Sequence, residues 1–449
     1  MTAPRPRRSF LANCSGLLLG SALGSFPNIF VRNATAQTPG GHPNPRIQQA
    51  RETALGVLKP SARDLEYGLK LHAESLVFDS YGFAPRAALD GDAFKAAAEA
   101  GTPDPELNDL REEMMMTRWA TDPVERREFL EAMQAAGVTC IFQNAGEEGS
   151  DPLRLIKRLA RFTYATDLAR EDCPKAIRPA EVRAAKERGG HCLCFSLNGV
   201  PLRQLWESTR DELRLIRIFH QLGIRMMHLT YNRRNPIGDG AGEPGNGGLS
   251  DFGHMVVREM NHVGVIVDVA HSGWRTSLEA AKASSKPMVA SHSAFGGVYS
   301  HFRGKPDEVV RAICDTGGFL GVCLISRFLG GEGDIAAMLR HLDYGIRTFG
   351  DEHVAIGTDV AYISRNEETE RAKISKQSVA RPALSAGSTR WEHLWPADSF
   401  VPKPHAERSL AWTNWPLFTV GLVQQGHSDN TIRKILGENV LRVLAASSI

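Results

Sequence analysis

Three short segments combine metal-binding residue types with the ends of apolar, strand-like runs. They are Asp268-Val269-Ala270-His271, Ser291-His292-Ser293 and Gly357-Thr358-Asp359. A neutral imidazole is the commonest protein ligand of zinc, and a carboxylate can bind a metal or accept a proton. If the strands are neighbours, we expect His271 and His292 to converge on one ion, with Asp359 nearby. Each residue also has a purely structural explanation, as a buried polar side chain satisfied by hydrogen bonds.

Eight apolar runs, with amphipathic stretches between them, must position these residues. The runs are 75–78, 139–143, 192–197, 226–230, 263–270, 287–291, 319–325 and 354–358. Near-continuous apolar strands are typical of a parallel sheet covered on both faces, and eight strand–helix units close a barrel. We therefore predict an α/β fold, a (β/α)8 TIM-type barrel, with a doubly wound open sheet as the alternative. The C-terminal strand ends would form the mouth, where His271, His292 and Asp359 would lie.

The first 36 residues have the pattern of an export signal. Arg7 and Arg8 precede an apolar stretch at 17–19, and Ala34-Thr35-Ala36 resembles a cleavage site. The paired arginines are typical of a twin-arginine signal. We therefore expect an exported protein, periplasmic or otherwise extracytoplasmic. The polar segment 37–58 is expected to be a linker, and residues 59–449 are expected to form the barrel.

A long segment, 361–404, interrupts the barrel pattern near its end. It carries Trp391, Glu392, His393 and Trp395. Connections of this length in a compact domain are usually functional, so we expect a lid-like insertion over the mouth.

Composition restricts the classes of partner. The formal net charge is only +2, with 23% charged residues, which does not favour binding to nucleic acid. Beyond the signal, no stretch reaches the roughly 18 uncharged apolar residues of a membrane helix. The spacing of the cysteines matches no disulfide framework, so we expect buried thiols. The expected partners are a small-molecule substrate and a second copy of the chain in a homodimer.

Further motifs resemble the membrane (renal) dipeptidase family of metallopeptidases. They are Leu229-Thr230-Tyr231-Asn232, Gly248-Leu249-Ser250-Asp251-Phe252-Gly253, Arg303-Gly304-Lys305-Pro306-Asp307 and Leu436-Gly437-Glu438-Asn439. The resemblance spans most of the chain from about Leu76 onward. It implies a barrel of the metal-dependent hydrolase, amidohydrolase-like kind that uses two zinc ions to hydrolyse dipeptides.

The resemblance implies roles for four residues that match the family. His271 and His292 match the two histidines of the second metal. Asp359 matches the aspartate that handles the proton, and Arg303 matches an arginine that contacts the substrate.

Other family positions are replaced in this chain. The pattern Asp-Gly-His-x-Asp, which supplies ligands to the first metal, stands here as Asp79-Ser80-Tyr81-Gly82-Phe83. Asn198 occupies the place of the bridging glutamate, and Tyr231 that of a substrate-contacting histidine. Phenylalanine cannot bind a metal and tyrosine rarely binds zinc. We therefore expect one zinc ion and no second ion.

The favoured prediction is an exported, zinc-dependent hydrolase of a dipeptide-like or other small amide substrate. His271, His292 and Asn198 would hold the ion, and Asp359 would act as the catalytic residue that moves the proton. The residues expected to line the substrate pocket are Arg303, Tyr231 and Tyr81.

Two other functions stay open. The replaced ligands would suit a catalytically inactive barrel that binds a small ligand or an exported partner. A barrel with metal-free chemistry could use Tyr81, Asp359 and His271. His228 is left out of the predicted site, because it lacks a paired spacing and strand alternation places it on the opposite face from Tyr231.

Overall fold

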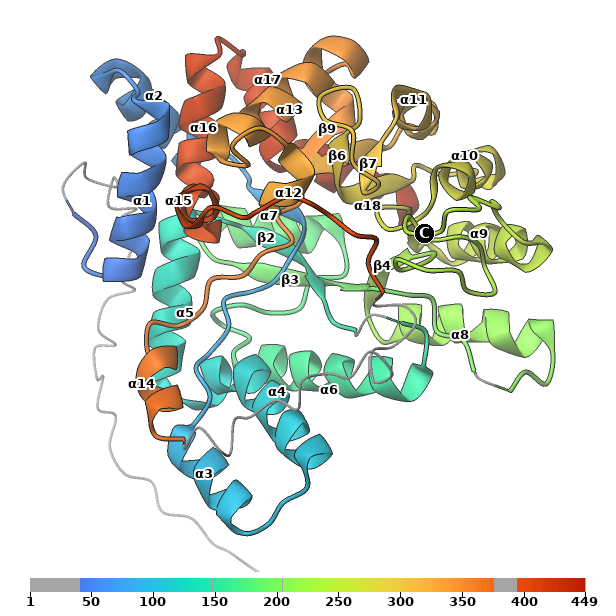
Figure 1. The fold of residues 1–449 in the computed structure, drawn as a ribbon, viewed down its shortest axis with the longest axis horizontal. Coiled ribbons are helices and arrows are strands. Elements are labelled where there is room, and N and C mark those ends of the chain that lie inside the picture. The colour runs from blue at the N-terminus through green and yellow to red at the C-terminus, as the bar shows by residue number, and fades with distance from the viewer. Residues whose placement is uncertain (1–40, 147–148, 204, 375–393, 449) are drawn as a thin grey trace, which may run out of the picture. The chain divides into compact units, whose positions relative to one another are not determined.

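A parallel β-barrel surrounded by helices forms the centre of the computed structural model, which describes residues 41–146, 149–203, 205–374 and 394–448 (Figure 1). The strands of the ring, in spatial order, are β1 Phe78–Gly82, β2 Cys140–Asn144, β3 Cys192–Leu197, β4 Ile224–His228, β5 Ile266–Asp268, β6 Val289–Phe295, β8 Phe319–Val322 and β9 Val354–Ile356. Chain order and spatial order coincide, and the short strand β7, Gly304–Lys305, pairs with β6 outside this ring. The predicted (β/α)8 barrel is confirmed.

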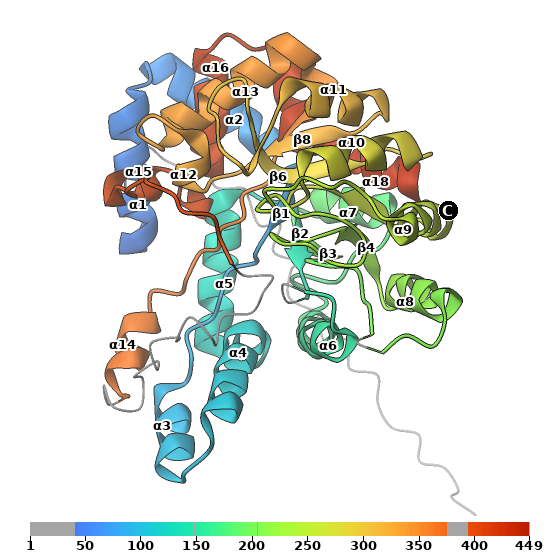
Figure 2. The same ribbon diagram turned by 45° about the vertical axis from the view of Figure 1, so that its right-hand side comes forward.

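Helices follow most of the strands and cover the outside of the barrel (Figures 1 and 2). Their bounds are α1 Pro45–Leu58, α2 Ala62–Glu74, α3 Gly91–Glu99, α4 Asp104–Thr121, α5 Pro123–Ala136, α6 Pro152–Leu168, α7 Pro179–Glu187, α8 Thr209–Gln221, α9 Asp251–Val263, α10 Trp274–Ala283, α11 Asp307–Asp315, α12 Ser326–Leu329, α13 Ile335–Phe349, α14 Glu367–Ala372, α15 Pro404–Ser409, α16 Trp415–Gln424, α17 Asp429–Arg433 and α18 Asn439–Ser447. Because helices cover one sheet face and the barrel interior fills the other, every residue of β2 and β3 is buried.

Side chains help to close the seam between β1 and β9. Ser80 Oγ donates to the carbonyl oxygens of Ser291 (2.7 Å) and Ile356 (3.0 Å), and the Asp359 amide donates to the Tyr81 carbonyl (3.0 Å). A Cβ atom at Gly357 would lie 2.0 Å from the Ser291 carbonyl oxygen, so only glycine fits there. This seam carries Tyr81 and Asp359 to the same end of the barrel.

The segment 37–58 is not a linker throughout, because Pro45–Leu58 forms α1. Asn44 caps this helix by accepting a hydrogen bond from the Arg46 amide, and proline occupies the first helical position. One face of the helix is buried by Ile47, Ala50 and Ala54. The linker prediction is therefore wrong for these residues, whose apolar side chains recur at helical spacing and pack into the core.

Two expectations lie largely outside the described residues. They are the export signal at 1–36 and the part of the insertion that contains Trp391, Glu392 and His393. In the described first part of this insertion, α14 lies beside α3 (Figures 1 and 2), and the Gly91 amide donates to Glu370 Oε2 (2.9 Å). The lid and the export signal stay predictions.

The cysteines in the described part of the chain are unpaired thiols, and all except Cys314 are buried. Cys140 Sγ lies 3.7 Å from Cys194 Sγ on the neighbouring barrel strand but is not bonded to it. The prediction of core thiols is confirmed. Among the helices of the described ranges, none has the length and apolar character needed to span a bilayer.

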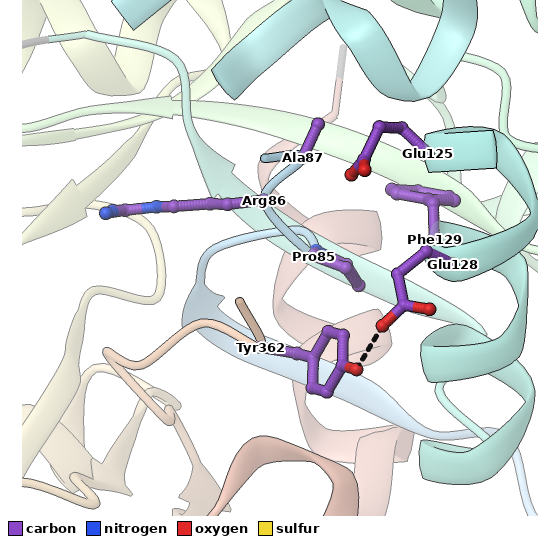
Figure 3. A pocket seen from close by; sticks show the side chains of 7 residues that line it. All are labelled: Pro85, Arg86, Ala87, Glu125, Glu128, Phe129 and Tyr362. Carbon is purple, nitrogen blue, oxygen red and sulfur yellow. Dashed lines mark hydrogen bonds between the residues drawn. The ribbon is translucent and has the colours of Figure 1, made fainter. Parts of the chain in front are cut away.

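A buried acidic cluster connects α5 to the segment after β9, beside a small pocket (Figure 3). The lining residues are Pro85, Arg86, Ala87, Glu125, Glu128, Phe129 and Tyr362. The Glu128 carboxylate accepts hydrogen bonds from the Tyr362 hydroxyl, from Asn44 Nδ2 (3.1 Å) and from Arg365 Nε (2.7 Å). Glu128 thus connects these segments structurally. The residues that line the pocket include none of the predicted site residues.

Replacing Glu128 by glutamine is expected to lower the free energy of unfolding by about 2–3 kcal/mol, since buried donors lose a charged acceptor. Glu131→Gln is the matched control. Glu131 pairs with Arg365 at 2.6 Å but is 23% exposed, so its replacement should cost less than about 1 kcal/mol. Urea titrations of the two variants measure both values, and equal losses would contradict the assignment.

Candidate metal centre

The predicted site residues gather at the C-terminal ends of the barrel strands. Tyr81 lies on β1, Asn198 follows β3, Tyr231 follows β4, His271 follows β5, His292 lies on β6, Arg303 precedes β7 and Asp359 follows β9. His292 lies within its strand rather than just after it, because β6 is longer than the sequence pattern indicated. The barrel thus places all seven residues at the mouth.

His271 and His292 meet directly, with their Nε2 atoms 2.9 Å apart. His271 Nδ1 lies 3.0 Å from Asn232 Oδ1. An amide oxygen only accepts hydrogen bonds, so Nδ1 carries the proton and Nε2 presents its lone pair. His292 Nδ1 lies 2.9 Å from Ser291 Oγ. Both rings are held by hydrogen bonds from outside the pair, as in metal-binding histidines.

The surroundings keep both imidazoles neutral. Burial lowers the pKa of His271 and of His292 well below the usual 6.5, and the positive charge of Arg303 lowers both further. Arg303 is itself fully buried, with Nη2 3.3 Å from His271 Nε2 and Nη1 donating to the Ala270 carbonyl. Neutral imidazole is the form that binds metal, so these histidines have the required donor chemistry.

Two of the replacement residues contact each other. The Tyr81 hydroxyl donates to Asn198 Oδ1 (2.8 Å), and the Tyr81 ring stacks on His292 with ring centres 3.9 Å apart. Tyr81 is fully buried. It therefore covers His292 from the β1 side, while the roles of Tyr81 in substrate binding and of Asn198 as a ligand stay predictions.

Tyr231 and Asp359 are the partly exposed members of the predicted site. The Tyr231 ring stacks on His271 with ring centres 4.2 Å apart. Asp359 has a left-handed backbone conformation (φ 56°), and its Oδ2 lies 3.9 Å from Cys323 Sγ. Both side chains can therefore be reached from the mouth, as a substrate contact and a proton carrier require.

His228 lies in the same cluster, so the expectation that it lies on the opposite face from Tyr231 was wrong. It is fully buried, and its ring centre lies 5.3 Å from that of His271 and 5.2 Å from that of His292. Strand β4 ends at His228, so alternation cannot be extended to Tyr231, which lies beyond the strand. Asp268 is the register partner of His228 on β5. Histidine and aspartate at the ends of two adjacent strands are the sequence signal that could have revealed it.

Asp79 is a buried carboxylate behind the mouth. It accepts hydrogen bonds from the Thr358 amide (2.9 Å), the Thr358 hydroxyl (2.6 Å) and Trp412 Nε1 (3.2 Å). Burial raises the pKa of Asp79 to about 7, because the cost of burying the charge outweighs these hydrogen bonds, which lower it.

The stability of the protein is therefore expected to depend on pH through Asp79. The folded pKa of about 7 lies above the usual 3.8, so the contribution is complete below about pH 4 and is lost as the pH rises towards 7. The variant Asp79→Asn lacks this titration. Urea titrations of both proteins at several pH values should show the wild type losing stability relative to the variant across this range. A difference independent of pH would contradict the shifted pKa.

These features define a class: a (β/α)8 barrel with histidines and carboxylates at its mouth, as in metal-dependent hydrolases. The profile of the membrane dipeptidase family, peptidase family M19, matches residues 103–370. The chain belongs to this family.

Individual relatives agree with this assignment. Dipeptidase tcpJ of Claviceps purpurea is 27% identical over 256 residues, which are 56% of this chain and 50% of that protein. Dipeptidase aclJ of Aspergillus oryzae is 30% identical over 151 residues, 32% of this chain and 36% of that protein. The chain thus spans about half, or less, of the length of the curated relatives that it matches.

Solved structures show the same fold. An amidohydrolase from Pseudomonas aeruginosa superposes with a TM-score of 0.61 at 24% identity, over 85% of this chain and 98% of that chain. A metallo peptidase from Rhodobacter sphaeroides, liganded with a phosphinate mimic of the dipeptide L-Ala-D-Ala, superposes with a TM-score of 0.57 at 17% identity, over 83% and 99%.

Proposed function

We propose that this chain is a metal-dependent hydrolase that cleaves a dipeptide-like or other small amide substrate with a single zinc ion. The observation that carries the proposal is the buried, neutral pair His271 and His292, with Nε2 atoms 2.9 Å apart at the barrel mouth. Membership of the membrane dipeptidase family supports the reaction class. The dipeptide mimic bound by the Rhodobacter sphaeroides peptidase supports the substrate class.

The residues present fit one zinc ion better than two. His271 and His292 supply neutral nitrogen donors, and Asn198 supplies a neutral carbonyl oxygen. At the first-metal position, Tyr81 and Asn198 are already hydrogen-bonded to each other at 2.8 Å. A bound zinc ion supplies polarisation of the amide carbonyl and makes water nucleophilic near neutral pH.

The protein groups around the mouth have complementary tasks. Asp359, partly exposed beside the cluster, takes up and returns the proton. Arg303 Nε has no hydrogen-bond partner among the described residues, so it can bind a substrate carboxylate. The Tyr231 ring, stacked on His271 at the mouth, holds the substrate over the histidines.

Removal and return of metal tests this function. The protein, purified without chelators, is assayed against a library of dipeptides with detection of released amino acids. We expect turnover that is lost on chelation and restored by zinc. Turnover that survives complete metal removal would contradict a metal-dependent reaction and favour chemistry by Tyr81, Asp359 and His271.

A binding protein is the second candidate, and the stacking of Tyr81 on His292 favours it because it covers one side of the site. Dipeptides or small amides would then bind without being hydrolysed. Calorimetric titration in the presence of chelator distinguishes the two: tight, chelator-insensitive binding without turnover supports the binding protein.

The place of action is also a proposal. The twin-arginine-like pattern at Arg7 and Arg8 supports export to the periplasm or another extracytoplasmic space. Cell fractionation of the full chain and of an Arg7→Lys/Arg8→Lys variant tests this, since export should fail in the variant. Gel filtration with light scattering tests the expected homodimer.

A further inference from the structure

We propose that this chain binds its metal ion through His228 and Asp268 together with His292, deeper in the barrel than the His271 and His292 pair. The metal would be a divalent transition-metal ion such as zinc or cobalt. This inference deepens the proposed function, and any catalytic use of the ion rests on that function. His228 and Asp268 end their strands, whereas His271 follows three residues after the end of β5.

The three residues lie on three successive strands of the barrel. His228 and Asp268 are direct register partners on β4 and β5, and β6 carries His292 beside them. Neighbouring residues in register on parallel strands project to the same side of the sheet. One donor atom from each of the three residues can be chosen so that all lie within 4.8 Å of one another, and all three residues are buried. The arrangement offers two nitrogen donors and one oxygen donor, a common set for zinc.

Polar atoms in this cluster lack hydrogen-bond partners. Asp268 Oδ1 accepts from the amides of Ala270 (2.9 Å) and Ser291 (3.1 Å). Oδ2 lies 2.6 Å from His228 Nε2, which is ion-pair distance if His228 is protonated, but neither atom makes a hydrogen bond. Within the described residues, His228 Nδ1 has no polar partner, and His228 Nε2 and Asp268 Oδ2 contact each other without a hydrogen bond.

Buried polar atoms that make no hydrogen bond call for a specific explanation, such as a bound ion. A cation between His228 Nε2 and Asp268 Oδ2 would satisfy both atoms at once. Two ligand atoms of a tetrahedral zinc ion lie about 3.4 Å apart, so binding would widen the present 2.6 Å contact slightly.

Charge also favours this position over one centred on His271. The Arg303 guanidinium lies 3.3 Å from His271 Nε2 and uses the lone pair that a metal would need. Asp268, in contrast, presents a carboxylate oxygen. A divalent cation is therefore repelled on the Arg303 side and attracted on the Asp268 side.

His292 can bind the metal in the proposed position while its contact with Ser291 stays unchanged. Ser291 Oγ lies 2.9 Å from His292 Nδ1, and a hydroxyl can both donate and accept a hydrogen bond. The same contact therefore supports the tautomer that leaves the Nε2 lone pair free for a metal.

Cobalt binding tests the inference without any substrate. The full, metal-free protein is titrated with Co²⁺ while the visible d–d absorption is recorded, for the wild type, His228→Ala, Asp268→Asn and His271→Ala. We expect one ion per wild-type chain. Loss of a residue that only supports a ligand weakens metal binding roughly 10–100-fold. We expect the affinity for cobalt to fall by more than this in His228→Ala and Asp268→Asn. In His271→Ala it should fall by no more than this.

Two further variants keep the result interpretable. His72→Gln is the matched control, since His72 on α2 is equally buried but bonds Thr419 on α16 and Ala136 on α5, and it should bind cobalt like the wild type. His228→Cys should add a thiolate-to-cobalt charge-transfer band, which a purely structural residue could not produce.

Cobalt binding that depends on His271 but not on His228 or Asp268, or a His228→Cys protein without the new band, would overturn the inference. Either result would leave a metal-dependent hydrolase possible in the proposed form, with His271 as ligand. Conversely, if no dipeptide were hydrolysed, the proposed function would be overturned. The cobalt spectra would still show whether His228 and Asp268 bind the metal.

Discussion

Replacing His292 by alanine is expected to reduce kcat/KM for a dipeptide substrate by about ten-thousandfold. His292 contacts His271 at 2.9 Å and belongs to the group formed with His228 and Asp268. It is therefore a ligand in either arrangement of the metal. Loss of the metal removes several kcal/mol of transition-state stabilisation, and about 1.4 kcal/mol corresponds to each tenfold in rate. Steady-state kinetics with parallel metal analysis measure the effect.

The control is His72→Gln, a change at a buried histidine in the interface of α2 with α5 and α16. It should lower stability while leaving kcat/KM close to that of the wild type. The metal-dependent account would be wrong if His292→Ala kept full turnover. A similar loss in both variants would point instead to general damage of the fold.

Asp359→Asn is expected to lower kcat by about 10²–10⁴-fold while leaving the metal content unchanged, since it removes a proton carrier and not a ligand. Asparagine is the informative replacement because, like aspartate, it tolerates the left-handed backbone (φ 56°) at this position. Kinetics and elemental analysis on the same preparation give both quantities.

The outcome separates two roles of Asp359. A kcat within about twofold of the wild type would remove Asp359 from the proton transfer. Loss of the metal in Asp359→Asn would make it a ligand. A fall in kcat with the metal retained supports the proton-carrier role.

The barrel could be predicted because each strand is short, apolar and buried on both faces. Such runs have one stable arrangement when amphipathic helices separate them. Strand ends were less predictable. The run 263–270 contains only three residues of β5, Ile266–Asp268, because apolar residues that flank a strand are buried as well. The first helix was missed although Asn44 and Pro45 form a helix start, since its buried face consists of a single isoleucine and two alanines.

The site was predictable where local sequence motifs define it. His271, His292, Arg303 and Asp359 are set by the motifs around them and do lie at the mouth. The place of His228 in the cluster was missed because it follows from strand register: His228 lies beside Asp268 only when β4 and β5 pair as they do. A pattern read along one strand cannot supply that information. The contact between Tyr81 and Asn198 likewise depends on the order of the strands β1, β2 and β3 in the barrel.

The most direct test of a single-metal hydrolase is a titration of the metal-free protein with zinc while dipeptide turnover is recorded. The account predicts that turnover is absent without metal, rises with added zinc and saturates at about one ion per chain. Turnover that needs two ions per chain, or that proceeds equally well in the metal-free protein, would contradict it.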